Sequence, residues 1–244
     1  MKTAIDIGNT NVKAGFFEKN GLSELLRFPS QPWSNFYQHL GSLETFGKCI
    51  LSSVIPIPEH IIHYILNKSS NFIVLSSQTP LPFHNDYKSR VTLGSDRLSL
   101  VAGAMRYFPD QDIIIVNAGT CITYSLITSK HRFKGGAISP GLRMRLEALH
   151  KFTASLPLID PAPEVELIGT TTERSILSGG VKGIVFEIEG YIAALQKKYK
   201  QIRIILSGGD ARYLAEQLTL KPEILPDLAL TGLIEILDFN VKKK

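Results

Sequence analysis

A polar segment near the N-terminus carries residue types that bind phosphate. It consists of Asp6, Ile7, Gly8, Asn9, Thr10, Asn11, Val12 and Lys13, with apolar residues on both sides. Gly8 lets the backbone approach a ligand closely, Asn9 and Thr10 offer donors beside main-chain N–H groups, and Lys13 supplies a positive charge. Asp6 would then face a hydrated cation or water bound to that phosphate. A hairpin in which Gly8 and Asn9 simply make the turn is the alternative.

A second candidate site follows a long stretch without periodicity. Residues 76–91, which include Tyr87, contain prolines and polar residues, and loops of this length are usually functional or disordered. Gly94, Ser95, Asp96 and Arg97 come next, and the apolar residues after them recur at helical spacing. Asp96 and Arg97 therefore fall in the first turn of a helix, where unpaired N–H groups and the helix dipole favour anions. Ordinary helix capping by Asp96 is the alternative.

The second half of the chain begins with a segment similar to the first. Residues 113–116 are apolar, Asn117, Ala118, Gly119 and Thr120 follow, and residues 121–127 form another strand-like run. Repetition of a strand-turn-strand unit predicts two similar lobes that face each other across a cleft, each with a loop for one polyphosphate. Coincidence between two short hairpins is the alternative.

Hydrophobic periodicity predicts the elements that must position these residues. We expect strands at residues 3–5, 12–17, 22–28, 49–53, 72–75, 113–116, 121–127 and 202–206. We expect helices at residues 33–40, 59–67, 98–105, 142–149 and 176–195, around 214–218, and from 228. Thr170 and Glu173 fit a capping box for the long fifth helix. The order of strands and helices predicts a mixed sheet with helices on its faces.

Composition limits the class of protein. The 244 residues are 44% hydrophobic and 20% charged, which is typical of a globular chain of one or two domains. The net charge of +5 comes without a basic helix face, so we expect no nucleic-acid partner. Cys49 and Cys121 give neither a disulfide framework nor a zinc pattern. Lys2 leads directly into the polar turn and no apolar run approaches 18 residues, so we expect a cytoplasmic protein without a membrane segment.

Taken together, these motifs resemble those of the type III pantothenate kinases, in the acetate and sugar kinase/Hsp70/actin superfamily. The resemblance runs nearly end to end and depends on the combination of segments, since each is weak alone. The segments are 6–10 with Lys13, 94–97, 118–120, 135–141, Thr172 before 178–179, and 207–210. The resemblance implies an α/β fold of two ribonuclease-H-like (actin-like ATPase) lobes, 1–110 and 111–244, each a mixed sheet flanked by helices, with a cleft between them.

The same resemblance implies ATP- and Mg²⁺-dependent phosphorylation of pantothenate at its primary hydroxyl, the first step of coenzyme A synthesis, by a homodimer. Carried over position by position, residues 6–13 and Thr120 would bind the ATP phosphates, with Asp6 reaching Mg²⁺ through water. Asp96 would be the general base. The pantothenate contacts would be Tyr87, Gly94, Ser95, Asp96, Arg97 and Thr172. Arg97 suits the substrate carboxylate because its guanidinium is a fixed fork of donors.

One position departs from the family pattern. The family commonly has Asp where this chain has Asn117, and that carboxylate is associated with a monovalent cation such as K⁺ or NH₄⁺. Asn lacks the charge, so cation binding should be weaker. Two rival functions are a kinase for a sugar or small acid, and an accessory factor for transcription that resembles the kinase. The Gly94 to Arg97 combination argues against the first, and the joint presence of Asp6, Lys13 and Asp96 argues against the second.

Overall fold

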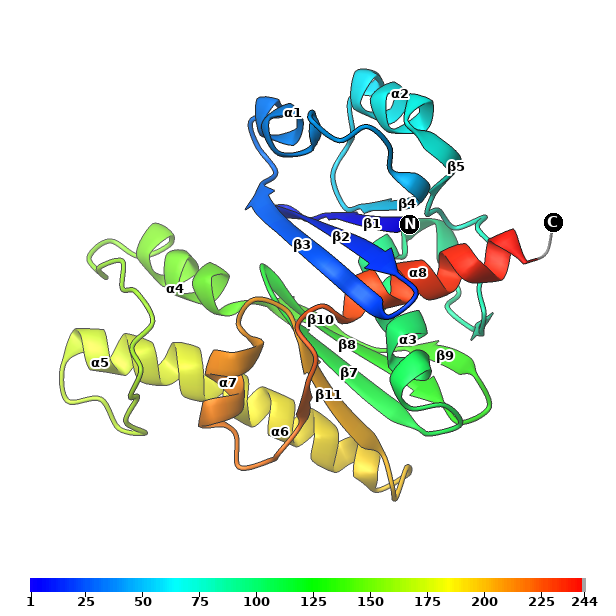
Figure 1. Ribbon diagram of the computed structural model, residues 1–244. Coiled ribbons are helices and arrows are strands. Elements are labelled where there is room, and N and C mark those ends of the chain that lie inside the picture. The colour runs from blue at the N-terminus through cyan, green and yellow to red at the C-terminus, as the bar shows by residue number, and fades with distance from the viewer. Residues whose placement is uncertain (243–244) are drawn as a thin grey trace. The chain divides into compact units, whose positions relative to one another are not determined.

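The computed structural model describes residues 1–242, and the chain forms two compact units (Figure 1). Unit 1 contains Met1–Asp110, His131–Phe133 and the C-terminal segment from Asp227, and unit 2 contains Gln111–Lys130 and Lys134–Pro226. The predicted domain division at 110/111 stays a prediction, and the C-terminal segment packs within unit 1. In the described part of the chain, no helix has the length and apolar character needed to cross a membrane.

Unit 1 is built on a five-stranded mixed sheet in the order β3-β2-β1-β4-β5. The strands are β1 (Lys2–Ile7), β2 (Asn11–Glu18), β3 (Gly21–Pro29), β4 (Gly47–Ser53) and β5 (Ser69–Val74). The first three strands are antiparallel neighbours, whereas β1, β4 and β5 run parallel. The predicted N-terminal hairpin and the predicted mixed sheet are confirmed.

Helices cover both faces of this sheet (Figure 1). Helices α1 (Ser34–Leu40) and α2 (Glu59–Asn67) share one hydrophobic cluster with alternate residues of β1, Ile5 and Ile7. Helix α8 (Leu228–Val241) packs against β1, β2 and β4 and against helix α3 (Ser95–Tyr107). Within the predicted loop 76–91, a two-residue strand β6 (His84–Asn85) pairs in parallel with the start of β9 (Arg132–Gly135), and a 3₁₀ turn at Arg90–Thr92 follows.

Two glycines allow helices α3 and α8 to approach closely. A Cβ atom added at Gly232 of α8 would lie 1.7 Å from the carbonyl oxygen of Ser99 and 2.6 Å from the backbone nitrogen of Gly103 in α3. A Cβ atom added at Gly103 would lie 2.3 Å from the carbonyl oxygen of Leu228. These contacts are with backbone, which cannot rotate away. Glycine at 232 therefore fixes where α3, and hence its first turn, lies on the unit.

We expect Gly232→Ala to destabilise the protein by about 3 kcal/mol, because the methyl group forces the two helix backbones apart. Urea denaturation of the purified variant measures this loss. Gly190→Ala is the matched control, since Gly190 lies in a helix of unit 2 and its added Cβ would have no neighbour within 4 Å. That substitution should gain up to about 1 kcal/mol of helix propensity. Similar stabilities for the two variants would contradict the close-packing argument.

Unit 2 contains the second predicted sheet. Its strands are β7 (Ile113–Ala118), β8 (Cys121–Thr128), β10 (Ile138–Pro140), β11 (Arg203–Ser207) and β12 (Glu223–Ile224). β7 pairs antiparallel with β8 and parallel with β11, and β12 lies parallel on the far side of β11. The order β8-β7-β11-β12 has the same strand directions as β2-β1-β4-β5 of unit 1. The internal repeat that the sequence predicted is therefore a repeat of topology.

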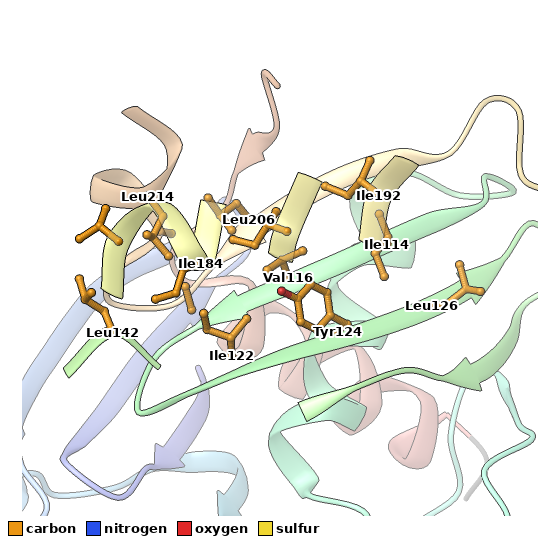
Figure 2. Packing of buried hydrophobic residues seen from close by; sticks show 14 of the residues in the cluster. Ile114, Val116, Ile122, Tyr124, Leu126, Leu142, Ile184, Ile192, Leu206 and Leu214 are labelled. Atoms are coloured by element: carbon orange, nitrogen blue, oxygen red, sulfur yellow. The ribbon is translucent and has the colours of Figure 1, made fainter. Parts of the chain in front are cut away.

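The core of unit 2 lies between its sheet and its helices. These are α4 (Leu142–Lys151), α5 (Thr172–Leu177), α6 (Gly183–Gln196) and α7 (Ala211–Gln217). Ile184 and Ile192 of α6 point toward Ile114 and Val116 of the sheet (Figure 2). The predicted long helix is α5 and α6 joined by a π-helical turn, Ser178–Lys182.

The N-cap threonine lies one residue after the predicted one, and the predicted capping box does not form because Arg174, and not Glu173, is at the third helical position. Thr171, and not Thr170, is the N-cap of α5, and its hydroxyl accepts a hydrogen bond from the backbone N–H of Arg174 at 3.3 Å. Three successive threonines offer the same side-chain chemistry here, and only the backbone of Thr171 is extended at the point where the helix begins. The prediction of a threonine cap was right in chemistry and wrong in position.

Candidate active site

Three polar residues lie side by side on neighbouring strands of unit 1. The strand register places Asp6 of β1 opposite Lys13 of β2 and opposite Ser52 of β4. Residues directly opposite one another project from the same face of a sheet. Asp6 is therefore flanked by a cation on one side and a hydroxyl on the other, next to the turn between β1 and β2.

The turn itself is fixed through its backbone. The N–H of Gly8 donates to the carbonyl oxygen of Asn11 at 2.9 Å, and a Cβ atom at Gly8 would lie only 3.2 Å from that oxygen. The buried Ser30 donates its N–H to the carbonyl of Thr10 at 3.0 Å and its hydroxyl to the carbonyl of Asn9 at 2.9 Å. The side chains of Asn9, Thr10 and Asn11 remain exposed. A rigid turn with exposed donors is suited to holding an anion.

Helix α3 begins beside this turn because serines tie it to β4. Ser52 donates its hydroxyl to Ser95 Oγ at 3.0 Å, and Ser95 donates to the carbonyl of Ser53 at 3.0 Å. The next residue, Asp96, lies in the first turn of α3. A Cβ atom at Gly94 would lie 2.3 Å from Asp96 Oδ1, so glycine at 94 leaves the space that this carboxylate occupies. The predicted residues Gly94, Ser95 and Asp96 are thus brought to Asp6.

The two carboxyl groups have pKa values above the ordinary range. Burial and, to a smaller extent, the charge of Asp96 raise the pKa of Asp6, Lys13 and Ser52 lower it, and the net result is a pKa of about 6. Burial also raises the pKa of Asp96, whereas hydrogen bonds from the backbone N–H groups of Arg97 and Asp96 and the positive charge of Arg97 lower it. A carboxylate with a raised pKa is better suited to accepting a proton from a hydroxyl than an ordinary exposed carboxylate.

We expect Asp6→Asn to stabilise the nucleotide-free protein at neutral pH. Because the folded pKa is raised, the folded state binds more protons than the unfolded state between pH 4 and 6, so stability falls as pH rises through that window. The shift in the pKa of Asp6 from 3.8 to about 6 corresponds to a loss of at most about 3 kcal/mol in the free energy of unfolding. The partial exposure of Asp6 reduces this loss to about 1–2 kcal/mol.

Urea denaturation in EDTA at pH 4.5 and pH 7.5 checks this expectation. The advantage of Asp6→Asn over the wild type should be present at pH 7.5 and clearly smaller at pH 4.5, where the wild-type carboxyl is protonated in the folded state. An equal difference at both pH values would show that the charge of Asp6 is not its cause.

Arg97 is a buried cation in the same first turn. Its side chain is only 3% exposed, and it hydrogen-bonds with Tyr87 and lies near Asp96. Burial lowers the pKa of Arg97, whereas Tyr87 and Asp96 raise it. Buried ionised groups are costly unless they are paired, and Tyr87 and Asp96 provide partners for this guanidinium. Tyr87 and Arg97, which the sequence predicted as substrate contacts, are therefore neighbours.

An acidic residue that sequence reasoning missed lies beside Lys13. Asp227, immediately before α8, has its Oδ1 3.5 Å from Lys13 Nζ and 2.5 Å from Arg27 Nη2. The two cations lie in neighbouring strands, at opposed positions of β2 and β3. No spacing in the sequence connects Asp227 with Lys13, so only the three-dimensional structure could identify the pair.

Unit 2 carries the remaining predicted residues on closely packed turns. The Gly119 N–H donates to the Cys121 carbonyl at 3.1 Å, and a Cβ atom at Gly141 would lie 2.2 Å from the Gly119 carbonyl oxygen. Gly208 has a φ of +97° and would place a Cβ atom 2.2 Å from the carbonyl oxygen of Ala118. Glycines at 141 and 208 therefore let two turns close onto the turn that ends at the exposed Thr120.

Asn117 lies at the end of β7, between two hydroxyl residues. Its opposed neighbours are Thr123 on β8 and Ser207 on β11. Ser207 donates to the carbonyl of Leu225, whereas the buried Thr123 hydroxyl has no hydrogen-bond partner among the described residues. Thr172, the remaining predicted contact, is the first residue of α5 and is exposed.

The repeated topology and the phosphate-type turns define a protein of the actin-like ATPase and sugar kinase fold. Solved structures agree. A 2-dehydro-3-deoxygalactonokinase protein from Sinorhizobium meliloti has a TM-score of 0.56 at 10% identity, covering 100% of this chain and 99% of that one. A Baf family transcriptional activator from Campylobacter jejuni has a TM-score of 0.67 at 22% identity, covering 98% of this chain and 99% of that one. At these identities the likeness is one of fold.

Sequence similarity identifies the family. Residues 3–194 match the type III pantothenate kinase family. The type III pantothenate kinase of Christiangramia forsetii is 42% identical over 243 residues, which cover 98% of this chain and 99% of that protein. The chain belongs to the type III pantothenate kinase family, as its motifs predicted.

Proposed function

We infer that this chain transfers a phosphoryl group from ATP to the primary hydroxyl of pantothenate, the first step of coenzyme A biosynthesis. Family membership over nearly the whole chain supports the use of ATP and pantothenate. The observation that carries the residue assignments is the first turn of α3, where Asp96 lies beside Asp6 and precedes the buried Arg97. Phosphoryl transfer needs positioning, charge neutralisation and a base, and this turn provides all three residue types.

Each residue has a distinct role in the proposal. Asp96 accepts the proton of the substrate hydroxyl as that oxygen attacks the γ-phosphorus. The bond between the γ-phosphorus and the β–γ bridging oxygen breaks, and ADP leaves with that oxygen. Arg97 binds the substrate carboxylate, with Tyr87 and the segment 94–95 beside it. The turn of residues 6–13 and Thr120 hold the phosphates through N–H and hydroxyl donors, and Lys13 neutralises their charge. Thr172 completes the substrate contacts.

The residues of unit 1 fit a hydrated Mg²⁺ ion that accompanies ATP. Asp6 and Asp96 are two neighbouring carboxyl groups whose raised pKa values reflect burial, and a cation would favour their ionised forms. Residues 1–242 contain no cluster of three or more His, Cys, Asp or Glu side chains that could hold a metal ion. Mg²⁺ retains waters and binds through one or two carboxylates plus phosphates, so two neighbouring carboxyl groups are a sufficient protein contribution. The ion would neutralise charge on the phosphates.

The test is phosphorylation of pantothenate by the purified protein, measured as ADP release and as formation of the phosphorylated product by mass spectrometry. Turnover that requires both pantothenate and Mg²⁺ is expected. ADP release with a sugar or another small acid, but not with pantothenate, would overturn the substrate assignment. A folded protein without turnover on any of these substrates would overturn the kinase proposal itself.

We expect weak or absent activation by K⁺ and NH₄⁺, because position 117 carries an amide. Asn117→Asp should create or strengthen that activation, since the new carboxylate would add charge beside the buried oxygen of Thr123. Rates in Na⁺, K⁺ and NH₄⁺ should differ by about tenfold in the variant and by less than about twofold in the wild type. Unchanged cation dependence in the variant would mean that position 117 does not contribute to a cation site.

We also propose a homodimer. Unit 2 exposes large apolar side chains on β10 and α6, with exposed fractions of 63% for Ile138, 56% for Phe186 and 43% for Tyr191. Exposed apolar groups of this kind favour association. Sedimentation velocity at micromolar concentration should show twice the 27.0 kDa chain mass, and a monomer would contradict the proposal.

A cytoplasmic location, where thiols such as Cys49 stay reduced, belongs to the proposed function as well.

A further inference from the structure

A short segment of the chain, His131–Phe133, belongs to unit 1 although its neighbours on both sides belong to unit 2. It pairs with the loop that carries Tyr87. The N–H of His84 donates to the His131 carbonyl at 2.8 Å, and the N–H of Asp86 donates to the Phe133 carbonyl at 3.0 Å. The loop before α3 is therefore held by a segment far from it in sequence.

An ion pair strengthens this short ladder. Arg132 donates from Nε to Asp86 Oδ2 at 3.0 Å and from Nη2 to Asp86 Oδ1 at 2.5 Å. Two parallel hydrogen bonds from one guanidinium fix orientation as well as distance. The Asp86 side chain is only 18% exposed, and His84 Nε2 lies 3.0 Å from the same Oδ1. This pair sets the position of the loop relative to Phe133, next to Tyr87.

Phe133 and Tyr87 together border the guanidinium of Arg97. The two rings are nearly parallel, with an interplanar angle of 14° and centroids 6.2 Å apart. Arg97 Cζ lies 5.6 Å from the centroid of each ring. Phe133 is fully buried, and Phe83 packs edge-on against it at 6.4 Å. Aromatic faces at this distance attract a guanidinium, most strongly where water is excluded.

We propose that Phe133 and the Asp86–Arg132 pair are positioning residues that hold Arg97 in the orientation that binds the substrate carboxylate. An arginine side chain has many rotamers, and bidentate binding of a carboxylate requires one plane for the guanidinium. Because the two centroids are 6.2 Å apart and each lies 5.6 Å from Cζ, Phe133 and Tyr87 lie side by side and together restrict the guanidinium from one side. The Asp86–Arg132 pair keeps the two rings together. This inference rests on the proposed function, because it assigns to Arg97 the carboxylate of pantothenate.

The experiment compares two substrates, pantothenate and pantothenol, in which an uncharged hydroxymethyl group replaces the carboxylate. In Phe133→Leu, KM for pantothenate should rise about 10- to 30-fold, while kcat and KM for ATP change less than about twofold. Activity with pantothenol, measured as kcat/KM, should also change less than about twofold, since it has no carboxylate for Arg97. A loss shared equally by both substrates, or a fall in kcat at unchanged KM, would overturn the proposal and indicate a structural role.

Two further variants keep the test decisive if Phe133→Leu folds poorly. Arg132→Lys breaks the bidentate pair at a side chain that is 43% exposed, and it should raise KM for pantothenate severalfold with the same selectivity. In a protein that already carries Arg97→Lys, Phe133→Leu should add little to the change in KM, because the planar guanidinium that Phe133 positions is absent. Full additivity of the two changes would overturn the proposal.

Phe46→Leu is the matched control, because Phe46 is also fully buried in unit 1 and packs on Tyr64 instead of Arg97. It should lower stability without changing the ratio of activities on the two substrates. A change in that ratio equal to that of Phe133→Leu would overturn the proposal. Wild-type protein that phosphorylates neither substrate would instead refute the proposed function, so the two failures are distinguishable.

Discussion

Asp96→Asn should lower kcat for pantothenate phosphorylation by about 10³-fold. The amide has the same shape as the carboxyl group but cannot accept the proton of the attacking hydroxyl. Asp96 lies in the first turn of α3, and its raised pKa places its proton affinity closer to that of a working base than an exposed aspartate would have. Pre-steady-state quench experiments that measure the chemical step directly are the appropriate measurement.

Binding and stability separate this loss from a structural defect. Calorimetry should show pantothenate and ATP affinities within about threefold of the wild type, because Arg97 and the turn at residues 6–13 are unchanged. Thermal stability at pH 7.5 should be equal or higher, since one of two neighbouring negative charges is removed. Wild-type turnover in Asp96→Asn would exclude this residue as the base.

Lys13→Ala should raise KM for ATP by about 10²-fold, with a further decrease in kcat. Lys13 lies opposite Asp6 in the sheet, next to the rigid turn between β1 and β2, so its ammonium group is placed for the phosphates. The affinity for pantothenate in the absence of nucleotide should not change. Titration of each ligand by calorimetry, together with steady-state kinetics, checks all three expectations.

Arg27→Ala is the matched control for Lys13→Ala. Arg27 contacts the same carboxylate, Asp227, but its side chain is 50% exposed and it lies one strand further from Asp6. Its loss should change KM for ATP by less than about threefold. Equal effects of the two substitutions would show that the net charge near Asp227, and not the placement of Lys13, controls nucleotide binding.

The parts of the site that the sequence predicted are those built from local structure. Asp6 and Lys13 face each other because a tight hairpin fixes which residues are opposed, and apolar periodicity places Asp96 and Arg97 at the start of α3. Such patterns extend over ten to fifteen residues at most. The succession of strands and helices along unit 1 followed from the same local signals, as did the repeat in unit 2.

The parts that sequence reasoning missed depend on contacts between distant segments. Asp227 reaches Lys13, and Phe133 reaches Arg97, from segments whose own patterns indicate only a helix start and a strand. The break in the predicted long helix was missed for a related reason. Gly179 and Gly180 indicate low helix propensity, but the π-helical turn also depends on packing, since a Cβ atom at Gly180 would lie 2.8 Å from Leu146.

The discontinuity of unit 1 has a consequence for synthesis on the ribosome. Helix α8, which covers β1, β2, β4 and α3, is translated after all the other elements of unit 1. At translation rates of about 5–20 residues per second, the stretch from the end of β5 at Val74 to the end of α8 at Val241 takes roughly 8–33 s, and the N-terminal sheet waits that long for its partner helix. During that time the apolar surface that α8 will cover is available to chaperones. A nascent chain that terminates before Asp227 lacks the helix that packs against α3, so incomplete products lack the contacts that position the first turn of α3.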